Sequence, residues 1–204
     1  FTLTREKINN ISAYVNYDGQ TAIITVTRFD KNTGTIVQNI AKEFSSKNIN
    51  KVILDLRNNG GGYVDSAITM LSLWLDNSVA LIQKSKHHGT TESKTPSNQA
   101  ILKDYKTVVL VNNFSASASE IVAGALKDHK KATLIGEKTF GKGVVQSLFE
   151  LSDGENLKVT TARWYTPLGH SINKTGIEPD QTVHRSFDDI NDNKDPQLDA
   201  AKNL

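Results

Sequence analysis

Apolar residues recur at two different spacings along most of the chain, and this alternation predicts a series of strands and helices. Short β-branched or aliphatic runs predict strands at residues 21–27, 51–56, 79–82, 107–111 and 133–136. Apolar positions at helical spacing predict helices at 33–47, 63–76 and 117–127. Strands that alternate with helices are typical of an α/β domain with a mostly parallel sheet and flanking helices.

The pattern changes after Gly143. Residues 144–151 and 157–164 are separated by Ser152-Asp153-Gly154, and they predict a C-terminal β-hairpin. The polar stretch 84–99 predicts an exposed hairpin or loop. The tail is acidic and polar, and it ends in a predicted short helix at 196–204. We therefore expect an N-terminal segment at 1–20, a core at 21–187 and a C-terminal tail at 188–204.

Composition narrows the possible functions. A net charge of +2 over 204 residues is too mild to indicate nucleic-acid binding. The absence of cysteine excludes thiol catalysis, disulfides and thiolate metal sites. The chain starts at Phe1 with neither an initiator Met nor a signal pattern, so we expect it to be a piece of a longer protein.

A serine stands where the strand at 107–111 passes into a helix. Ser117 and Glu120 match a capping box, in which both side chains bond to amides at the helix start. The same position places a hydroxyl beside free N–H groups, including that of Ala118, which would favour a developing oxyanion. Ser115 and Ser119 are alternatives that the local pattern leaves open.

A lysine between two glycines follows later in the chain. Isolated lysines are usually solvated surface charges, but Gly141 and Gly143 would let the backbone turn Lys142 inward. A lysine that acts as a base has to be neutral, which requires its pKa to fall from ~10.4 by about three units. Gln146 is uncharged and could orient such an amine. Serine and lysine together form a pair capable of acyl transfer without histidine.

Consecutive glycines end the strand at 51–56. Residues 60–62 could form a plain turn into the next helix. Alternatively, the amide of Gly61 or Gly62 could supply the second half of an oxyanion hole.

Two other chemistries are disfavoured. Residues 136–142 resemble a phosphate-binding P-loop, but Gly143 replaces the magnesium-binding hydroxyl and a strand pattern follows where a helix is needed. His87 and His88 are adjacent and lack metal-ligand spacing, so no metal site is expected. A Ser-His-Asp triad using His170 or His184 has no local support.

Five segments together resemble one peptidase family. They are residues 55–59, 115–121, 136–143, 160–167 and 176–180, and they resemble the signatures of the carboxyl-terminal processing peptidases, the tail-specific proteases of family S41. The resemblance runs from about Ala22 to Asp180. It implies a fold related to the ClpP/crotonase group and a serine endopeptidase that needs no metal and no organic cofactor.

The resemblance also implies roles for particular residues. It makes Ser117 the nucleophile, Lys142 the general base and Gln146 the residue that positions the lysine. The oxyanion donors would be the amide of Ala118 and an amide of Gly61 or Gly62.

Further expectations rest on the resemblance alone. Substrates would be proteins cleaved near their carboxyl ends, in an extracytoplasmic setting of the cell envelope or periplasm, and a homo-oligomer is possible. A PDZ domain would precede or interrupt the core in the full-length protein, so residues 1–20 would follow it. The chain departs from the family at Gly60, where Pro is common, and at His170, where Arg is more usual.

Two rival functions remain. One is a non-catalytic relative that binds peptides or other ligands, against which intact Ser117, Lys142 and Gln146 argue. The other is a crotonase-type enzyme acting on thioesters, which has no support beyond a shared fold.

Overall fold

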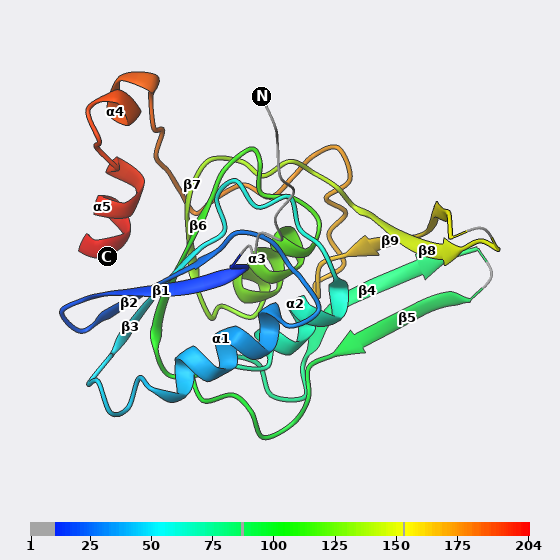
Figure 1. The fold of residues 1–204 in the computed structure, drawn as a ribbon, viewed down its shortest axis with the longest axis horizontal. Coiled ribbons are helices and arrows are strands. Elements are labelled where there is room, and N and C mark those ends of the chain that lie inside the picture. Colours follow the sequence, from blue (N-terminus) through cyan, green and yellow to red (C-terminus); the bar gives the residue numbers. More distant parts are fainter. Residues whose placement is uncertain (1–10, 87, 153) are drawn as a thin grey trace, which may run out of the picture.

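The computed structural model describes residues 11–86, 88–152 and 154–204. Its larger sheet has the strand order β1-β2-β3-β6-β7-β10, in which β1 is antiparallel to β2 and the other neighbours run parallel (Figure 1). The strands are β1 (Ala13–Asp18), β2 (Thr21–Val26), β3 (Lys51–Asp55), β6 (Lys106–Val111), β7 (Thr133–Gly136) and β10 (Gln181–Thr182). The predicted α/β class with a mostly parallel sheet is confirmed.

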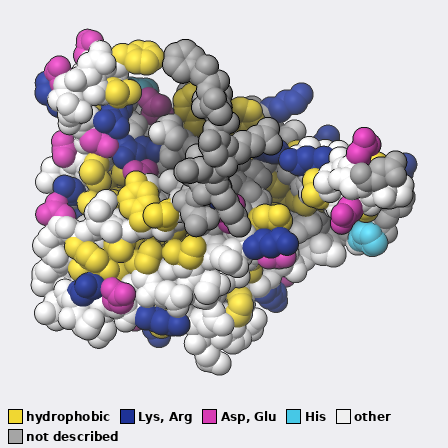
Figure 2. All heavy atoms as spheres, in the orientation of Figure 1, with side chains coloured by type: hydrophobic (Ala, Val, Ile, Leu, Met, Phe, Trp, Pro, Cys, Tyr) yellow, Lys and Arg dark blue, Asp and Glu magenta, His cyan; other side chains and the backbone are white. Residues whose placement is uncertain are grey.

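A second, antiparallel sheet extends from this core as an arm (Figure 1). Its strands are β4 (Val79–Ser85), β5 (Gly89–Lys94), β8 (Val144–Glu150) and β9 (Asn156–Tyr165), in the order β5-β4-β9-β8. The predicted C-terminal hairpin is therefore present as β8 and β9. It does not stand alone, because β4 pairs with β9 as well as with β5. Charged side chains of both signs gather at the outer end of the arm (Figure 2).

Helices cover both faces of the larger sheet. They are α1 (Thr33–Lys42), α2 (Val64–Leu71), α3 (Ala118–Asp128), α4 (Phe187–Asn191) and α5 (Pro196–Asn203). The main core joins α1, α2 and α3 to one face, with Val52 and Leu54 of β3 inside it. Ile53 points to the opposite face, where it is buried with Ala201 of α5. Because β3 is buried on both faces, its sequence is apolar at successive positions rather than at alternate ones.

The two helices before β4 are shorter than their apolar spacing predicted. Beyond Lys42 and beyond Leu71, the chain continues in tight turns that keep the next apolar side chains on the buried side. Phe44 donates from its amide to Ala41, and Trp74 donates to Leu71, both three residues back. Both aromatic rings stay buried, so the predicted spacing was right although Phe44 and Trp74 themselves make the shorter bonds of a turn.

Several elements had no clear pattern in the sequence. β1, β10 and α4 were not predicted, whereas α5 confirms the predicted C-terminal helix. Residues 1–10, the first half of the predicted N-terminal segment, lie outside the described residues. The division into segments at 20 and 187 stays a prediction. No helix in the described part of the chain is long and apolar enough to cross a bilayer.

Candidate active site

Ser117 lies at the turn between β6 and α3, in an unfavourable backbone conformation. Its dihedral angles are φ 56° and ψ −114°. A non-glycine residue at positive φ is uncommon, and most of the others in the described chain are asparagines, which tolerate it better. A strained serine between a strand and a helix is the geometry of a nucleophile elbow, which holds the hydroxyl out from the sheet. This backbone also explains why α3 starts at Ala118, one residue later than predicted.

The structure separates the three candidate serines. Ser115 and Ser119 are fully buried. Their hydroxyl groups donate to backbone carbonyls, Ser115 to Leu56 over 2.8 Å and Ser119 to Asn59 over 2.9 Å. Ser117 is only partly buried and lines a pocket. Among the three, Ser117 alone presents its side chain to a space that could hold a substrate.

Of the two hydrogen bonds of the capping box, only the one to the Glu120 side chain has normal geometry. The amide of Ser117 donates to Glu120 Oε2 over 2.9 Å. The Ser117 side chain faces the amide of Glu120 in the capping-box manner, but it makes no cap hydrogen bond of normal geometry. The hydroxyl is therefore not held as a cap, and the competition between capping and catalysis is weak here.

Glu120 does more than the capping pattern suggested. It is fully buried, and its carboxylate also accepts from the Thr139 hydroxyl over 2.6 Å and from the amides of Gly141 and Lys142 over 2.7 and 2.9 Å. Oε2 accepts from the amides of both Ser117 and Lys142, so these two backbone nitrogens lie within two hydrogen-bond lengths of each other. Glu120 joins the serine turn to the lysine loop.

The two glycines around Lys142 are needed for close packing. Gly141 has φ +90°, and a Cβ there would lie 2.8 Å from the amide nitrogen of Gly176. A Cβ on Gly143 would lie 2.7 Å from the Cβ of Asn173. The Lys142 carbonyl accepts from Trp164 Nε1 over 2.9 Å, which ties the loop to β9. This loop is thus fixed by backbone contacts that leave the lysine side chain free.

The glycine loop after β3 packs directly against the serine. A Cβ on Gly61, where φ is +96°, would lie 2.6 Å from the Ala116 carbonyl oxygen and 2.7 Å from the Ser117 Cβ. The Gly61 amide already donates to Asn59 Oδ1 over 2.9 Å. The amides of Gly62 and Ala118 make no hydrogen bond to the described part of the chain. Of the predicted oxyanion donors, these two are free.

Asn59 holds this loop through buried hydrogen bonds, and no role was predicted for it from the sequence. Its side chain is fully buried, and its Nδ2 donates to the Val26 carbonyl over 2.8 Å. Its own carbonyl accepts from the Ala116 amide and from the Ser119 hydroxyl. An asparagine directly before consecutive glycines at the end of a buried strand is a signal that could have indicated this role.

One pocket of about 280 Å³ brings the candidate residues together. It is lined by Gly60, Gly61, Gly62, Val64, Ser117, Ile121, Lys142, Val144, Val145, Gln146, Lys158 and Trp164. Gln146 enters it from β8, just past a bulge in the pairing with β9. No histidine is among the lining residues, and His184 instead contacts Glu137 outside this pocket. In the described chain, no three metal-binding side chains cluster.

A buried ion-pair network behind the glycine loop holds α5 to the sheet. Arg57 bonds through its guanidinium to Asp55 of β3 and to Asp195, the residue that caps α5, with nitrogen–oxygen distances of 2.7 and 2.8 Å. Gln197 accepts a further hydrogen bond from it. Asp55, Arg57 and Gln197 also line a separate hollow of about 510 Å³, which contains neither Ser117 nor Lys142.

Asp195→Asn is expected to destabilise the fold by about 2 kcal/mol at pH 7, because a charge-assisted hydrogen bond to a buried guanidinium is weakened. Burial alone would raise the pKa of Asp195, but hydrogen bonds from Arg57 and Leu198 and the nearby positive charges hold it below its usual value. A lowered folded-state pKa stabilises the fold above the unfolded value of ~3.9, and this contribution disappears as the pH falls through the folded-state pKa.

Urea unfolding at pH 7 and below pH 4 measures this effect. The difference between wild type and Asp195→Asn should shrink at the lower pH. Asp192→Asn is the matched control, since Asp192 pairs with Lys194 on the surface and should change stability by less than about 0.5 kcal/mol. An equal loss at both pH values would contradict the ionic explanation.

The fold and the pocket together define a class of protein. A parallel sheet, a strained serine between strand and helix, and free amides beside it form the architecture that serine hydrolases build on α/β sheets. The chain belongs to peptidase family S41, whose family model matches residues 20–183. The resemblance found in the sequence motifs is therefore confirmed at the level of the family.

Two curated relatives share much of the sequence. The carboxyl-terminal-processing protease of Synechocystis sp. is 43% identical over 212 aligned residues, covering all of this chain and 49% of the relative. A probable CtpA-like serine protease of Staphylococcus epidermidis is 40% identical over 198 residues, covering 94% of this chain and 40% of the relative. The chain thus spans about half or less of the relatives it matches.

Solved structures have the same fold. A photosystem II D1 C-terminal processing protease matches with a TM-score of 0.78 and 32% identity, covering 89% of this chain and 50% of that one. A lipoprotein from Streptococcus agalactiae matches with a TM-score of 0.77 at 21% identity, covering 95% and 69% respectively, which shows the fold alone. The ClpP-like fold expected from the resemblance is confirmed.

Proposed function

We propose that this chain is the catalytic core of a serine endopeptidase that uses Ser117 and Lys142. The observation that carries the proposal is the pocket that Ser117 and Lys142 line together with Gly62, whose amide is free. The amide of Ala118, the residue after Ser117, is also free. A nucleophile, a base and oxyanion donors are the minimal set for acyl transfer. Gln146 lines the same pocket and orients the lysine amine.

The reaction proceeds through an acyl-enzyme. Ser117 Oγ attacks the scissile carbonyl carbon while neutral Lys142 Nζ accepts the hydroxyl proton, and the free amides stabilise the oxyanion. The C–N bond then breaks as Lys142 returns the proton to the leaving amine. Water, deprotonated by Lys142, attacks the ester, and the Ser117 Oγ–carbon bond breaks with return of the proton to Ser117.

Protein substrates cut near their carboxyl ends are the proposed targets. The printed names of two relatives, a carboxyl-terminal-processing protease and a photosystem II D1 C-terminal processing protease, support this choice. We extend the proposal to an extracytoplasmic setting and to a PDZ domain in the full-length protein. The relatives are about twice as long as this chain, which leaves room for such a module.

The alternative is a non-catalytic relative that binds peptides in the same pocket. The two proposals differ in what they require of Ser117 Oγ, because a protein that only binds peptides does not need a reactive hydroxyl there. Ser117 lines the pocket, whereas the hydroxyl groups of Ser115 and Ser119 donate to backbone carbonyls. This difference favours the enzyme.

Labelling with a fluorophosphonate tests the proposal. The activated Ser117 Oγ should displace fluoride from phosphorus, and mass spectrometry of a digest should place the phosphonyl adduct on the peptide that contains Ser117. Ser117→Ala should abolish the label, and the buried Ser115 and Ser119 should stay unmodified. A folded wild-type protein that remains unlabelled would favour the binding relative.

A further inference from the structure

The candidate active-site pocket is lined by two lysines and no carboxylate. Besides Lys142, the lining includes Lys158, which comes from β9. The other lining residues are glycines, apolar side chains, Ser117 and Gln146. The reaction proposed above has no role for Lys158, so its charge in this pocket is unexplained.

Strand register places Lys158 on the pocket face of the hairpin. Lys158 lies opposite Leu148, and Thr160 lies opposite Gln146. Residues directly opposite each other, and those two apart along a strand, share one face of a sheet. Lys158 therefore lies on the same face as Gln146, and the other face carries the contact between Ser147 and Thr161.

Lys158 has no charge partner within the described chain. Glu150 is the diagonal neighbour by register, but no ion pair or hydrogen bond joins the two side chains. Two other lysines of the arm are engaged, because Lys94 pairs with Glu92 and Lys84 lies over the Tyr165 ring. Lys86, also in the arm, does not line this pocket. An unpaired ammonium facing a small pocket is complementary to an anion.

We propose that Lys158 binds a carboxylate of the peptide substrate and sets a preference for substrates with such a group close to the scissile bond. This inference rests on the proposed peptidase function. Gln146 and Leu148 are two residues apart, or about 7 Å along β8. An extended peptide advances a similar distance in two residues, so the carboxylate lies within about three residues of the bond that is cut.

Two sources of this carboxylate share one chemistry. It is either the α-carboxylate at the end of the substrate chain or the side chain of an Asp or Glu. If it is the α-carboxylate, the pocket itself recognises the carboxyl end of the substrate, in addition to any separate domain that binds this end. Both form a charge-assisted hydrogen bond with the ammonium group, which strengthens as the peptide excludes water from the pocket.

Binding to Ser117→Ala protein tests the proposal without any need for turnover. Fluorescence anisotropy would compare one apolar peptide with a free carboxyl end, the same peptide with a carboxamide end, and amidated peptides carrying Asp or Asn at each position in turn. Adding Lys158→Ala should weaken binding of the carboxylate-bearing peptides about tenfold and leave the amidated, uncharged peptide unchanged. The increase in affinity that the carboxylate provides should also become smaller as the salt concentration is raised.

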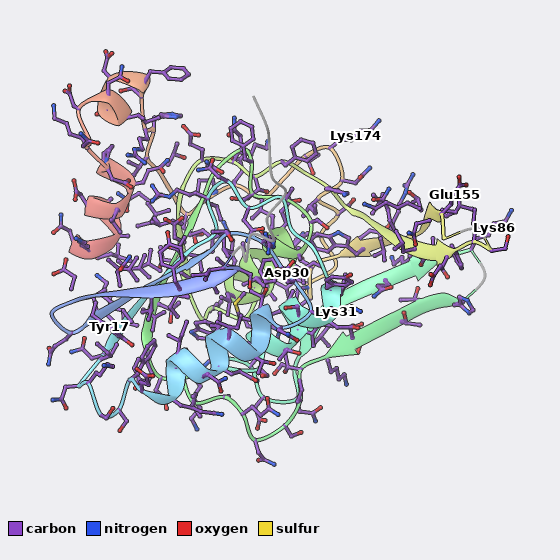
Figure 3. The ribbon with its side chains drawn as sticks, viewed as in Figure 1. Tyr17, Asp30, Lys31, Lys86, Glu155 and Lys174 are labelled. Atoms are coloured by element: carbon purple, nitrogen blue, oxygen red, sulfur yellow. The ribbon has the colours of Figure 1, made fainter. Side chains whose placement is uncertain are left out.

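The arms of this experiment separate every outcome. A Lys158-dependent advantage of the free carboxyl end assigns the α-carboxylate, and an advantage of Asp over Asn assigns a side chain. Lys86→Ala is the control, because Lys86 lies at the far end of the arm (Figure 3) and outside the pocket, and it should change nothing. Equal loss for charged and uncharged peptides, or no loss for any, would overturn the proposal. Failure of Ser117 to react with a fluorophosphonate would instead count against the peptidase function alone.

Discussion

Replacing Lys142 with methionine is expected to lower kcat for peptide cleavage about a thousandfold or more, with little change in thermal stability. General-base catalysis contributes about 10² to 10⁴ in rate, and methionine has no amine to accept the Ser117 proton. Methionine keeps the length of the apolar stem. The loop is held through the amide and carbonyl of residue 142, and both contacts survive the substitution.

Steady-state kinetics on an unfolded protein or peptide substrate measures this loss. Lys138→Met is the matched control, because Lys138 lies in the same segment but pairs with Glu178 on the surface. It should keep wild-type kcat. Ser117→Ala should be at least as damaging, and the double variant should lose no more than the worse single variant, since the two groups act as a unit. A Lys142→Met enzyme that kept a tenth of wild-type kcat would contradict the assigned base.

Glu120→Ala is expected to lose both stability and activity. Four donors would lose their acceptor in the interior, and each buried unsatisfied group costs about 1–3 kcal/mol. The expected total exceeds about 3 kcal/mol. Glu120→Gln should also be damaging although it is nearly isosteric, because an amide offers one oxygen and an NH₂ group where two carboxylate oxygens now accept. At least one backbone N–H would face another donor.

Denaturant unfolding, combined with fluorophosphonate labelling in conditions where each variant is fully folded, separates the two effects. If Glu120 sets the distance between the serine turn and the lysine loop, Glu120→Gln should label Ser117 more slowly than wild type even when folded. Glu178→Gln is the matched control on the surface and should label normally. Normal labelling of folded Glu120→Gln would limit Glu120 to a purely structural role.

Local sequence patterns were sufficient for much of the fold. Strands β2, β3, β6 and β7 are short and mostly apolar and alternate with amphipathic helices, so their places along the chain and the α/β class follow from periodicity. The bounds of α1 and α2 did not follow, because Phe44 and Trp74 occupy the expected buried positions through turns rather than through helical hydrogen bonds. Apolar spacing reports which face is buried and not which hydrogen bonds form.

The candidate site divides in a similar way. Ser117, Lys142 and Gln146 were named from motifs, and the structure brings them to one pocket, where their catalytic roles remain predictions. Lys158 could not have been named, because it depends on the register between β8 and β9. Glu120 was recognised only as a helix cap, since its bonds to Gly141 and Lys142 cross more than twenty residues.

The backbone at Ser117 has a consequence for the protein as a whole. The Ser117 backbone, at φ 56° and ψ −114°, has a conformation that glycine adopts far more easily than serine does. This strain lowers the stability of the native state at this one position. The native fold is therefore less stable than it would be with a glycine at this position. With Ser117 as the proposed nucleophile, this lost stability would be exchanged for activity.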